Sequence, residues 1–281
     1  MEGRSVHNLA VDVFEDPRSA LQRAAPFLAE DPVARNLPAT LLPAAIDGGW
    51  SIRCWVAHDG PSVVGLALQT DPRRFAMVFA DSRGVGLRLG DAVGADAIDL
   101  PSARGEVGVV APFAGAYAAV TGRPAVAGEA QRLYVLDAVR DPGVSGRVRS
   151  GTADDEEIVA RWAEGFVTDT GFGNPADVSS MLARLAAGLI RVWVDEDAPV
   201  SMGLSAPMAY GVSRVGWIYT PPEHRGQGYG AAVTAAISAE QLAGDATRCM
   251  LYAQLNNPVS NRIYRRLGYR AVSEDLGYDF D

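Results

Sequence analysis

The sequence predicts an α/β (α+β) protein with two tandem domains, each a mixed, mostly antiparallel sheet flanked by helices. With 281 residues, the chain is long for one hydrophobic core and comfortable for two. Each half has the same order of expected elements: two helices, a run of three strands, then helix, strand, helix and strand. The run Arg140-Asp141-Pro142-Gly143 is typical of a linker. We therefore expect one domain over residues 1–140 and a second over residues 146–281.

In the first half, apolar patterning and turn residues place each element. Asp16-Pro17 is a typical helix start, and Asp31-Pro32 begins a shorter helix that Pro38 and Pro43 limit. Asp59-Gly60 indicates a hairpin. The expected strands are Val6–Val13, Ser51–His58, Ser62–Gln69, Phe75–Ala80, Glu106–Val110 and Gln131–Val139. The later helices are Arg83–Ala95 and Ala111–Val120.

In the second half, the order of elements repeats. Thr152 is a good helix N-cap, followed by acidic residues in the first turn. The expected helices before the middle strands run to about Thr168 and over Ala176–Ala187, with a loop at Phe172–Pro175. The expected strands are Gly146–Gly151, Leu189–Val194, Ser201–Met208, Val215–Thr220 and Cys249–Ala253, with a final strand after Tyr269.

The composition limits the classes of partner. Apolar residues make up 48% and charged residues 21%, an ordinary globular balance. A formal net charge of −9 argues against nucleic acid or an anionic membrane as the main partner, and it is compatible with a cationic amine. Cys54 and Cys249 have apolar neighbours and no metal-ligand spacing, so we expect buried thiols and no metal site. Neither a secretory leader nor an apolar run of membrane-spanning length is apparent, so we expect a cytoplasmic protein.

A glycine-rich turn follows the strand Val215–Thr220. Its residues are Arg225, Gly226, Gln227, Gly228, Tyr229 and Gly230, and a helix of small residues follows. Backbone N–H groups at a helix start lack intrahelical partners, and the helix dipole adds positive charge there. Glycines let a phosphate approach the backbone closely, and an arginine adds a charged donor. The turn therefore favours a diphosphate, although an isolated turn of this kind often binds nothing.

A second motif follows at Asn257-x-x-Ser260-x-x-x-Tyr264-x-x-x-Gly268-Tyr269. Together, the two motifs resemble the acyl-CoA signatures of the GNAT superfamily of N-acetyltransferases, in that family's order and separation. Ser260 stands where the family pattern has alanine. The resemblance covers about Gly146–Asp281 and implies that acetyl-CoA is the acyl donor.

The resemblance implies roles for several residues. Tyr264 matches the tyrosine that protonates the departing thiolate, a role that suits a phenol of pKa about 10. Asn257 matches a contact to the pantetheine arm, and it is also a good N-cap before Pro258. The other expected contacts are backbone groups of Ile218, Tyr219 and Thr220 on a splayed strand, the phosphate loop Arg225–Gly230, and the small residue Ser260. Whether Trp217 and Tyr219 line the acceptor side or fill the core is open.

The general base is not apparent, because Val215–Thr220 contains no acidic residue. A chain of water molecules is our default for removing the proton of the attacking ammonium, with the carboxylates of Glu164, Asp169 and Asp281 as further candidates. Glu223 and His224 lie on the loop and are expected to face solvent.

The first half lacks both motifs. Its equivalent loop would be Ser82–Arg88, in which Arg88 occupies a position that needs a small residue. Its next helix carries Tyr117, but Val110 stands where the motif has asparagine. We expect this domain to be degenerate and to shape the substrate cleft, without binding a second CoA.

These patterns predict an acyl-CoA-dependent N-acyltransferase. A small-molecule or protein amine would attack the thioester directly in a ternary complex, since no cysteine lies near the motifs to form an acyl-enzyme. The alternative is a non-catalytic CoA-binding or regulatory protein with the same fold. The missing acidic residue favours that alternative, and Tyr264 argues against it.

Overall fold

The computed structural model describes residues 9–171 and 175–281, and its contacts divide the chain into two units. The first unit comprises Met1–Leu133, Gln254–Asn256 and Val272–Asp281, and the second comprises Tyr134–Ala253 and Asn257–Ala271. The units thus do not follow the chain in simple order, because the C-terminal residues belong to the first. The division into the two expected domains, residues 1–140 and 146–281, stays a prediction. Among the described helices, none has the length and apolar character to cross a membrane.

The sheet of the first unit is mixed and mostly antiparallel. Its strands lie in the order β1 (Leu9–Phe14), β2 (Arg53–Asp59), β3 (Ser62–Gln69), β4 (Ala76–Ala80), β5 (Ser102–Glu106), β12 (Arg270–Phe280) and β6 (Ala125–Leu136). Strands β1 to β4 pair antiparallel, β4 and β5 pair parallel, and β12 pairs antiparallel with β5. The hairpin expected at Asp59-Gly60 joins β2 to β3, with Gly60 at φ +57°.

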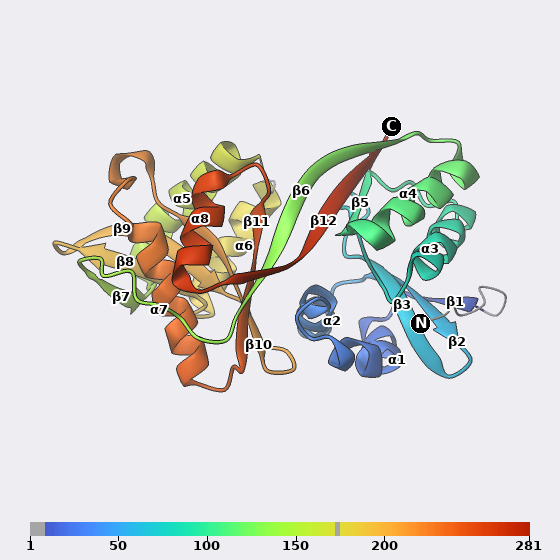
Figure 1. The fold of residues 1–281 in the computed structure, drawn as a ribbon, viewed down its shortest axis with the longest axis horizontal. Coiled ribbons are helices and arrows are strands. Elements are labelled where there is room, and N and C mark those ends of the chain that lie inside the picture. Colours follow the sequence, from blue (N-terminus) through green and yellow to red (C-terminus); the bar gives the residue numbers. More distant parts are fainter. Residues whose placement is uncertain (1–8, 172–174) are drawn as a thin grey trace. The chain divides into compact units, whose positions relative to one another are not determined.

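Helices cover both faces of this sheet (Figure 1). They are α1 (Pro17–Glu30), α2 (Asn36–Gly48), α3 (Arg83–Ala95) and α4 (Val107–Thr121). Asp16 caps α1 by accepting hydrogen bonds from Arg18 N and Ser19 N, as the Asp16-Pro17 pair predicted. A Cβ atom on Gly86 or Gly90 would collide with backbone carbonyl groups of α4. These glycines therefore let α3 and α4 approach closely.

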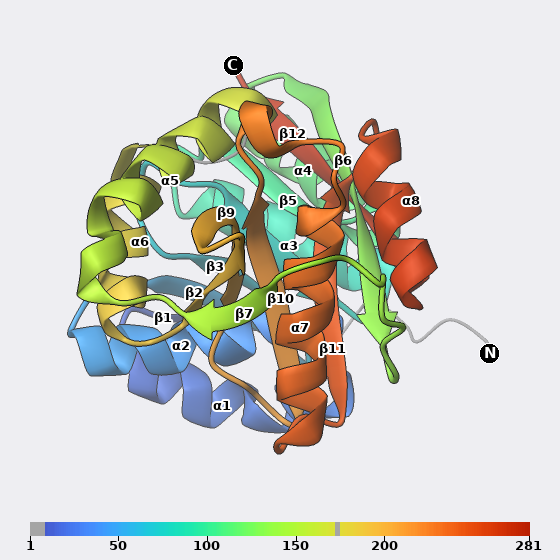
Figure 2. The ribbon, with the colours of Figure 1, turned by 90° about the vertical axis from the view of Figure 1, so that its left-hand side faces the viewer.

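The second unit has the strand order β6, β11 (Arg248–Gln254), β10 (Val212–Tyr219), β9 (Ala198–Ser205), β8 (Ile190–Asp195) and β7 (Arg147–Ser150). Helices α5 (Glu156–Thr170) and α6 (Pro175–Ala186) lie on one face, and α7 (Tyr229–Ala243) lies on the other (Figure 2). Helix α8 (Pro258–Leu267) packs into the same core as α7. Short 3₁₀ turns occupy Ala153–Asp155 and Pro222–His224. Thr152 forms the expected cap, in a capping box with Asp155.

The predicted fold class is confirmed, but three elements differ from expectation. Residues after Glu106 form α4 and not a strand, and the strand before it is Ser102–Glu106. Helix α4 begins with β-branched valines, which favour a strand. Most of its residues are apolar, so the sequence shows no regular alternation of apolar and polar faces that would indicate a helix. Helix α2 begins at Asn36 and continues through Pro43, so proline did not limit it. Strand β6 begins earlier, at Ala125. The expected loop at 172–174 lies outside the described residues.

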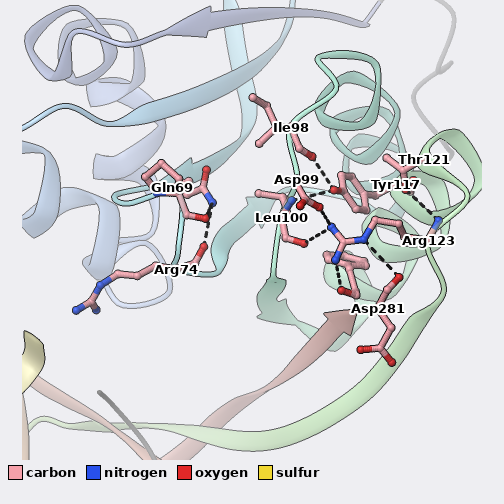
Figure 3. A network of polar contacts seen from close by, with 11 residues as sticks. Gln69, Arg74, Ile98, Asp99, Leu100, Tyr117, Thr121, Arg123 and Asp281 are labelled. Carbon is pink, nitrogen blue, oxygen red and sulfur yellow. Dashed lines mark hydrogen bonds and ion pairs between the residues drawn. The ribbon is translucent and has the colours of Figure 1, made fainter. Parts of the chain in front are cut away.

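The C-terminal strand β12 completes the core of the first unit. Phe280 is 3% exposed and packs against Tyr117 with ring centroids 4.4 Å apart. Arg123, which follows α4, donates hydrogen bonds to the backbone carbonyls of Phe280 and Leu100 and pairs with Asp99 (Figure 3). Residues after the second motif therefore stabilise the half of the chain that lacks the motifs.

Replacing Phe280 with alanine should destabilise the first unit by about 3–5 kcal/mol, because the change leaves a cavity beside Tyr117. The free energy of unfolding from denaturant titration, with amide exchange in α4 and β5, measures the effect. Val272→Ala on the same strand is the control, since Val272 is 43% exposed. Equal stability of the two variants would contradict the role assigned to β12.

Candidate functional site

The glycine-rich turn leaves the start of α7 open for an anion. Gly226 and Gly228 have φ of +82° and +88°, which glycine adopts without strain. Gly228 is the N-cap, and no side chain caps the helix. The first intrahelical bond is donated by Ala232 N to Gly228 O, at 3.0 Å. The preceding N–H groups in the first turn therefore have no intrahelical acceptor, and the helix dipole gives them a positive potential.

Strand β10 diverges from β11 directly before this turn. Among the described residues, the two strands pair in parallel only over Val212–Arg214 and Arg248–Met250. Beyond that point, β10 pairs only with β9, and the pairing shifts register between Gly216 and Tyr219. Trp217 lies in this bulge with φ +52°, an unusual value for a residue with a bulky side chain. The splay that the resemblance implied is therefore present, and it leaves one edge of β10 without β11 as partner.

Three residues connect the end of β10 to α5. Arg225 forms an ion pair with Asp169 of α5 and donates a 3.0 Å hydrogen bond to Thr220 O. Tyr219 donates a 3.1 Å hydrogen bond to the same Asp169 carboxylate, and the Arg225 guanidinium lies 5.8 Å from the Tyr219 ring centroid. This arrangement holds the only arginine of the glycine-rich turn beside the open helix start. The separation of 56 positions in the sequence hid this ion pair from sequence analysis.

The side chains of the expected contact residues are mostly occupied within the protein. Ile218 packs near Gly203 and Gly230, so its backbone, and not its side chain, faces the open edge. The Thr220 hydroxyl lies 2.9 Å from Ser201 Oγ, which also donates to Tyr219 O. The Tyr229 hydroxyl donates to Asp195 at 2.5 Å and lies 3.1 Å from Gln227 Oε1. The turn therefore offers backbone N–H groups to a ligand, beside an Arg225 side chain that is paired with Asp169.

Trp217 and Tyr219 both pack on the α5 and α6 face of the sheet. The Trp217 ring lies 4.6 Å from that of Phe166, and Tyr219 is 8% exposed. Both rings belong to the core under α5 and α6. Filling the core is therefore the better description of Tyr219, while Trp217 is only partly buried.

Tyr264 lies on the buried face of α8. Its ring packs edge-on against Tyr134 and Tyr269, at 6.1 and 5.9 Å between centroids. Burial raises the pKa of Tyr264 to about 12, and a hydrogen bond with the Ser260 side chain opposes that rise. The phenol is therefore protonated throughout the physiological pH range, and Ser260 lies beside its hydroxyl.

Asn257 and Asn261 organise the start of α8. Asn257 caps the helix, its side chain accepting a 3.0 Å hydrogen bond from Ser260 N. Asn261 is 3% exposed, donates to Asn257 O at 2.7 Å, and accepts from the Tyr134 hydroxyl at 2.7 Å. The sequence analysis missed Asn261 and Tyr134. The available signal was the position of Asn261, a polar residue four positions after the cap and on the same helix face as Asn257 and Tyr264.

The carboxylates considered as general bases are dispersed. Asp169 is bound to Arg225 and Tyr219, and Glu164 is exposed on α5. Asp281 lies in the first unit, where its carbonyl accepts from Arg123. Glu223 is exposed, as expected, whereas His224 is half-buried, 6.5 Å from the Tyr229 ring. None of these groups is joined to Tyr264 by a hydrogen bond in the described part of the chain.

In the first unit, the positions that correspond to the glycine-rich turn and to Tyr264 are occupied by contacts within the protein. Ser82, Arg83 and Gly86 form no loop, because α3 begins at Arg83 and the Ser82 side chain caps it by accepting from Val85 N. Gly86 serves helix packing. The Tyr117 hydroxyl is saturated by backbone, donating to Ile98 O at 2.6 Å and accepting from Leu100 N at 2.9 Å (Figure 3). The start of α3 is therefore closed by a side chain, unlike that of α7.

Comparisons with known proteins agree with this geometry. Residues 207–276, which contain both motifs, match the family model described as FR47-like protein. A search of curated proteins finds no significant match. A GCN5-related N-acetyltransferase from Sphaerobacter thermophilus superposes with a TM-score of 0.63 at 16% identity, over 96% of this chain and 95% of that one.

Two further solved structures cover nearly the whole chain. A GNAT-family acetyltransferase from Colwellia psychrerythraea has a TM-score of 0.60 at 9% identity, over 97% of this chain and 100% of that one. A tandem GNAT protein from the clavulanic acid biosynthesis pathway has a TM-score of 0.59 at 13% identity, over 96% and 97%. The resemblance that the two motifs indicated is thus confirmed, and the chain has the tandem fold of GNAT acetyltransferases.

Proposed function

We propose that the protein is an N-acyltransferase that uses an acyl-CoA, with acetyl-CoA as the donor. The observation that carries the proposal is the uncapped start of α7, with left-handed glycines at 226 and 228, next to the strand edge that β11 leaves open. An uncapped helix start suits a diphosphate, and an open strand edge suits an extended amide-containing arm. CoA carries both groups, because its diphosphate is followed by the extended, amide-containing pantetheine arm.

Each expected residue has a role in donor binding under this proposal. Backbone N–H groups at the start of α7 and the Arg225 side chain bind the diphosphate. The open edge of β10 near Ile218 pairs with the amides of the pantetheine arm. Asn257 and Ser260 border the thiol end, because Ser260 lies about one turn and the N-cap Asn257 about two turns before Tyr264 on the same helix.

The reaction is a direct transfer. The unprotonated amine nitrogen attacks the thioester carbonyl carbon, an N–C bond forms, and the C–S bond breaks. Tyr264 donates its proton to the departing thiolate and recovers one from solvent, while water takes the proton that the nitrogen loses. Orienting both reactants in one complex provides a large part of the rate.

The pKa of Tyr264 decides how this proton moves. A phenol of pKa about 12 is a poor donor to an aqueous thiolate of pKa about 8.5, since the transfer would cost about 5 kcal/mol. Burial raises a thiol pKa as well, and it raises the pKa of Cys249 in this same unit to about 12. A CoA sulfur held in a similarly dry place would match Tyr264, so the transfer would then be close to balanced.

The acceptor is an amine, on a small molecule or a protein, and we place the reaction in the cytoplasm without a nucleic acid or membrane partner. A net charge of −9 supports the exclusion of polyanionic partners. A screen of amines with acetyl-CoA, following free thiol, tests the activity. CoA binding without turnover of any amine would favour the non-catalytic alternative.

Gly230→Asp should reduce CoA affinity by roughly 100-fold or more, because a carboxylate in the first turn of α7 competes for the same N–H groups and repels phosphate. The helix should remain stable, since an acidic residue suits its start. Calorimetry measures affinity and the number of sites, for which we predict one per chain.

Gly230→Ala is the matched control. Its added Cβ meets only the Thr220 and Ile218 side chains, so it should bind much more tightly than Gly230→Asp. Equal affinities for the two variants would argue against phosphate binding here.

Tyr264→Phe should lower kcat by roughly 10²–10⁴ while leaving CoA affinity almost unchanged, because it removes only the hydroxyl. Since burial raises the pKa of Tyr264 to about 12, its deprotonation should not limit activity below about pH 11. Any alkaline limb at lower pH should therefore stay at the same position in the variant. Tyr134→Phe is the control for loss of a neighbouring buried hydroxyl. An unchanged kcat in Tyr264→Phe, with chemistry limiting turnover, would remove this residue from the mechanism.

A further inference from the structure

Helix α5 meets the glycine-rich turn through the Asp169 carboxylate. Asp169 lies in the last turn of α5, which ends at Thr170. The carboxylate forms an ion pair with Arg225 and accepts a 3.1 Å hydrogen bond from the Tyr219 hydroxyl. Tyr219 is the last residue of β10, and Arg225 begins the turn that leads into α7. One carboxylate of α5 therefore contacts both the end of β10 and the start of the turn.

Gly165 lets α5 approach β10 closely enough for this contact. It lies four positions before Asp169, on the same face of the helix. A Cβ atom on Gly165 would lie 2.3 Å from the Tyr219 hydroxyl oxygen, so a larger residue would displace the phenol. Burial raises the pKa of Tyr219, and the hydrogen bond to Asp169 raises it further. The phenol is therefore protonated at neutral pH and can donate to Asp169.

The Arg225 guanidinium is held on three sides. Its Nε donates to Thr220 O at 3.0 Å, its Nη2 pairs with Asp169, and its Cζ lies 5.8 Å from the centroid of the Tyr219 ring. In the planar guanidinium, Nε and Nη2 form one edge, and Nη1 and Nη2 form the next. The contacts with Thr220 and Asp169 both use the first edge. A phosphate can therefore approach the second edge, where two N–H groups match two of its oxygens.

Asp169 has two opposite effects on an anion at the turn. Its charge repels a phosphate, but solvent screens this repulsion because the Asp169 side chain is 37% exposed. Its contact also fixes Arg225, whose side chain is 49% exposed, before any ligand arrives. A long side chain that is already held loses less conformational freedom when it binds a ligand. We therefore expect the positioning effect to exceed the repulsion.

We propose that Asp169 is a positioning residue for the donor and holds Arg225 so that the second edge of its guanidinium binds the diphosphate. This proposal rests on the proposed function and adds to it a residue that lies outside both sequence motifs. Tyr219 supports the same carboxylate from β10. The phosphate site is then built from the last turn of α5 together with the glycine-rich turn, and both belong to the second unit.

Calorimetric titration of the full-length protein with CoA, and separately with inorganic pyrophosphate, tests the role of Asp169. Asp169→Ala should lower the affinity for both by roughly 3–10-fold, because Arg225 must then be immobilised on binding. Asp169→Asn keeps a hydrogen-bond acceptor for Arg225 and Tyr219, so it should recover most of the loss. Glu164→Ala is the matched control, since it removes a charge from an exposed position on the same helix. An unchanged affinity in Asp169→Ala would overturn the proposal, and so would a higher one, because Asp169 would then compete with the phosphate.

A chain that carries Arg225→Gln separates positioning from a general effect on α5. If Asp169 acts through Arg225, adding Asp169→Ala to that chain should cause little further loss of affinity. In steady-state assays, Asp169→Ala alone should raise KM for acetyl-CoA and leave kcat almost unchanged. The same loss of CoA affinity with and without Arg225→Gln would show that Asp169 only stabilises α5, which would contradict a positioning role.

Failure of the proposed function gives a different result. If CoA and pyrophosphate bind but no amine is acetylated, the proposed activity is wrong, and the affinities of the variants still decide the role of Asp169. If the wild-type protein binds CoA and Asp169→Ala binds it equally well, only the positioning role fails. Binding of neither probe to the wild-type protein would overturn both.

Discussion

The open start of α7 is the feature on which the candidate site depends. Side chains close several helix starts, since Asp16 caps α1, Ser82 caps α3 and Asn257 caps α8, whereas α2 and α4 begin without a side-chain cap. At α7, Gly228 occupies the N-cap, and no side chain caps the helix. The unused N–H groups and the dipole make this end a site for an anion. The pairing of β10 with β11 ends at Arg214, and the register of β10 with β9 shifts around Trp217, so an open strand edge precedes the open helix start.

The two units differ in the connection between the middle strand and the helix that follows it. In the first unit, the strand before α3 is separated from the helix by only Asp81 and Ser82, and the glycines of α3 allow close contact with α4. In the second unit, a longer segment from Thr220 to Gly228 separates β10 from α7. Tyr117 on α4 and Tyr264 on α8 differ in what their hydroxyl groups bind. The Tyr117 hydroxyl is saturated by backbone groups, whereas the Tyr264 hydroxyl is bonded to the small side chain of Ser260.

Sequence patterns predicted the local features of the fold and site but not the contacts between distant residues. Helix caps at Asp16, Thr152 and Asn257 were predictable because capping depends on a few adjacent residues. The run after Glu106 was misassigned because a short buried apolar segment has no periodicity to distinguish helix from strand. The ion pair of Arg225 with Asp169, the packing of Phe280 on Tyr117, and the bulge at Trp217 depend on tertiary structure, which no local pattern encodes.

The central claim is that the second unit alone binds CoA, at the start of α7 and along the open edge of β10. Backbone amide chemical shifts during a CoA titration test it most directly, because each amide reports its own environment. We predict saturable changes at residues 226–231 and 216–220, with none at the start of α3 near Val85 and Gly86. Similar changes at both helix starts, or changes that avoid residues 226–231, would contradict the claim.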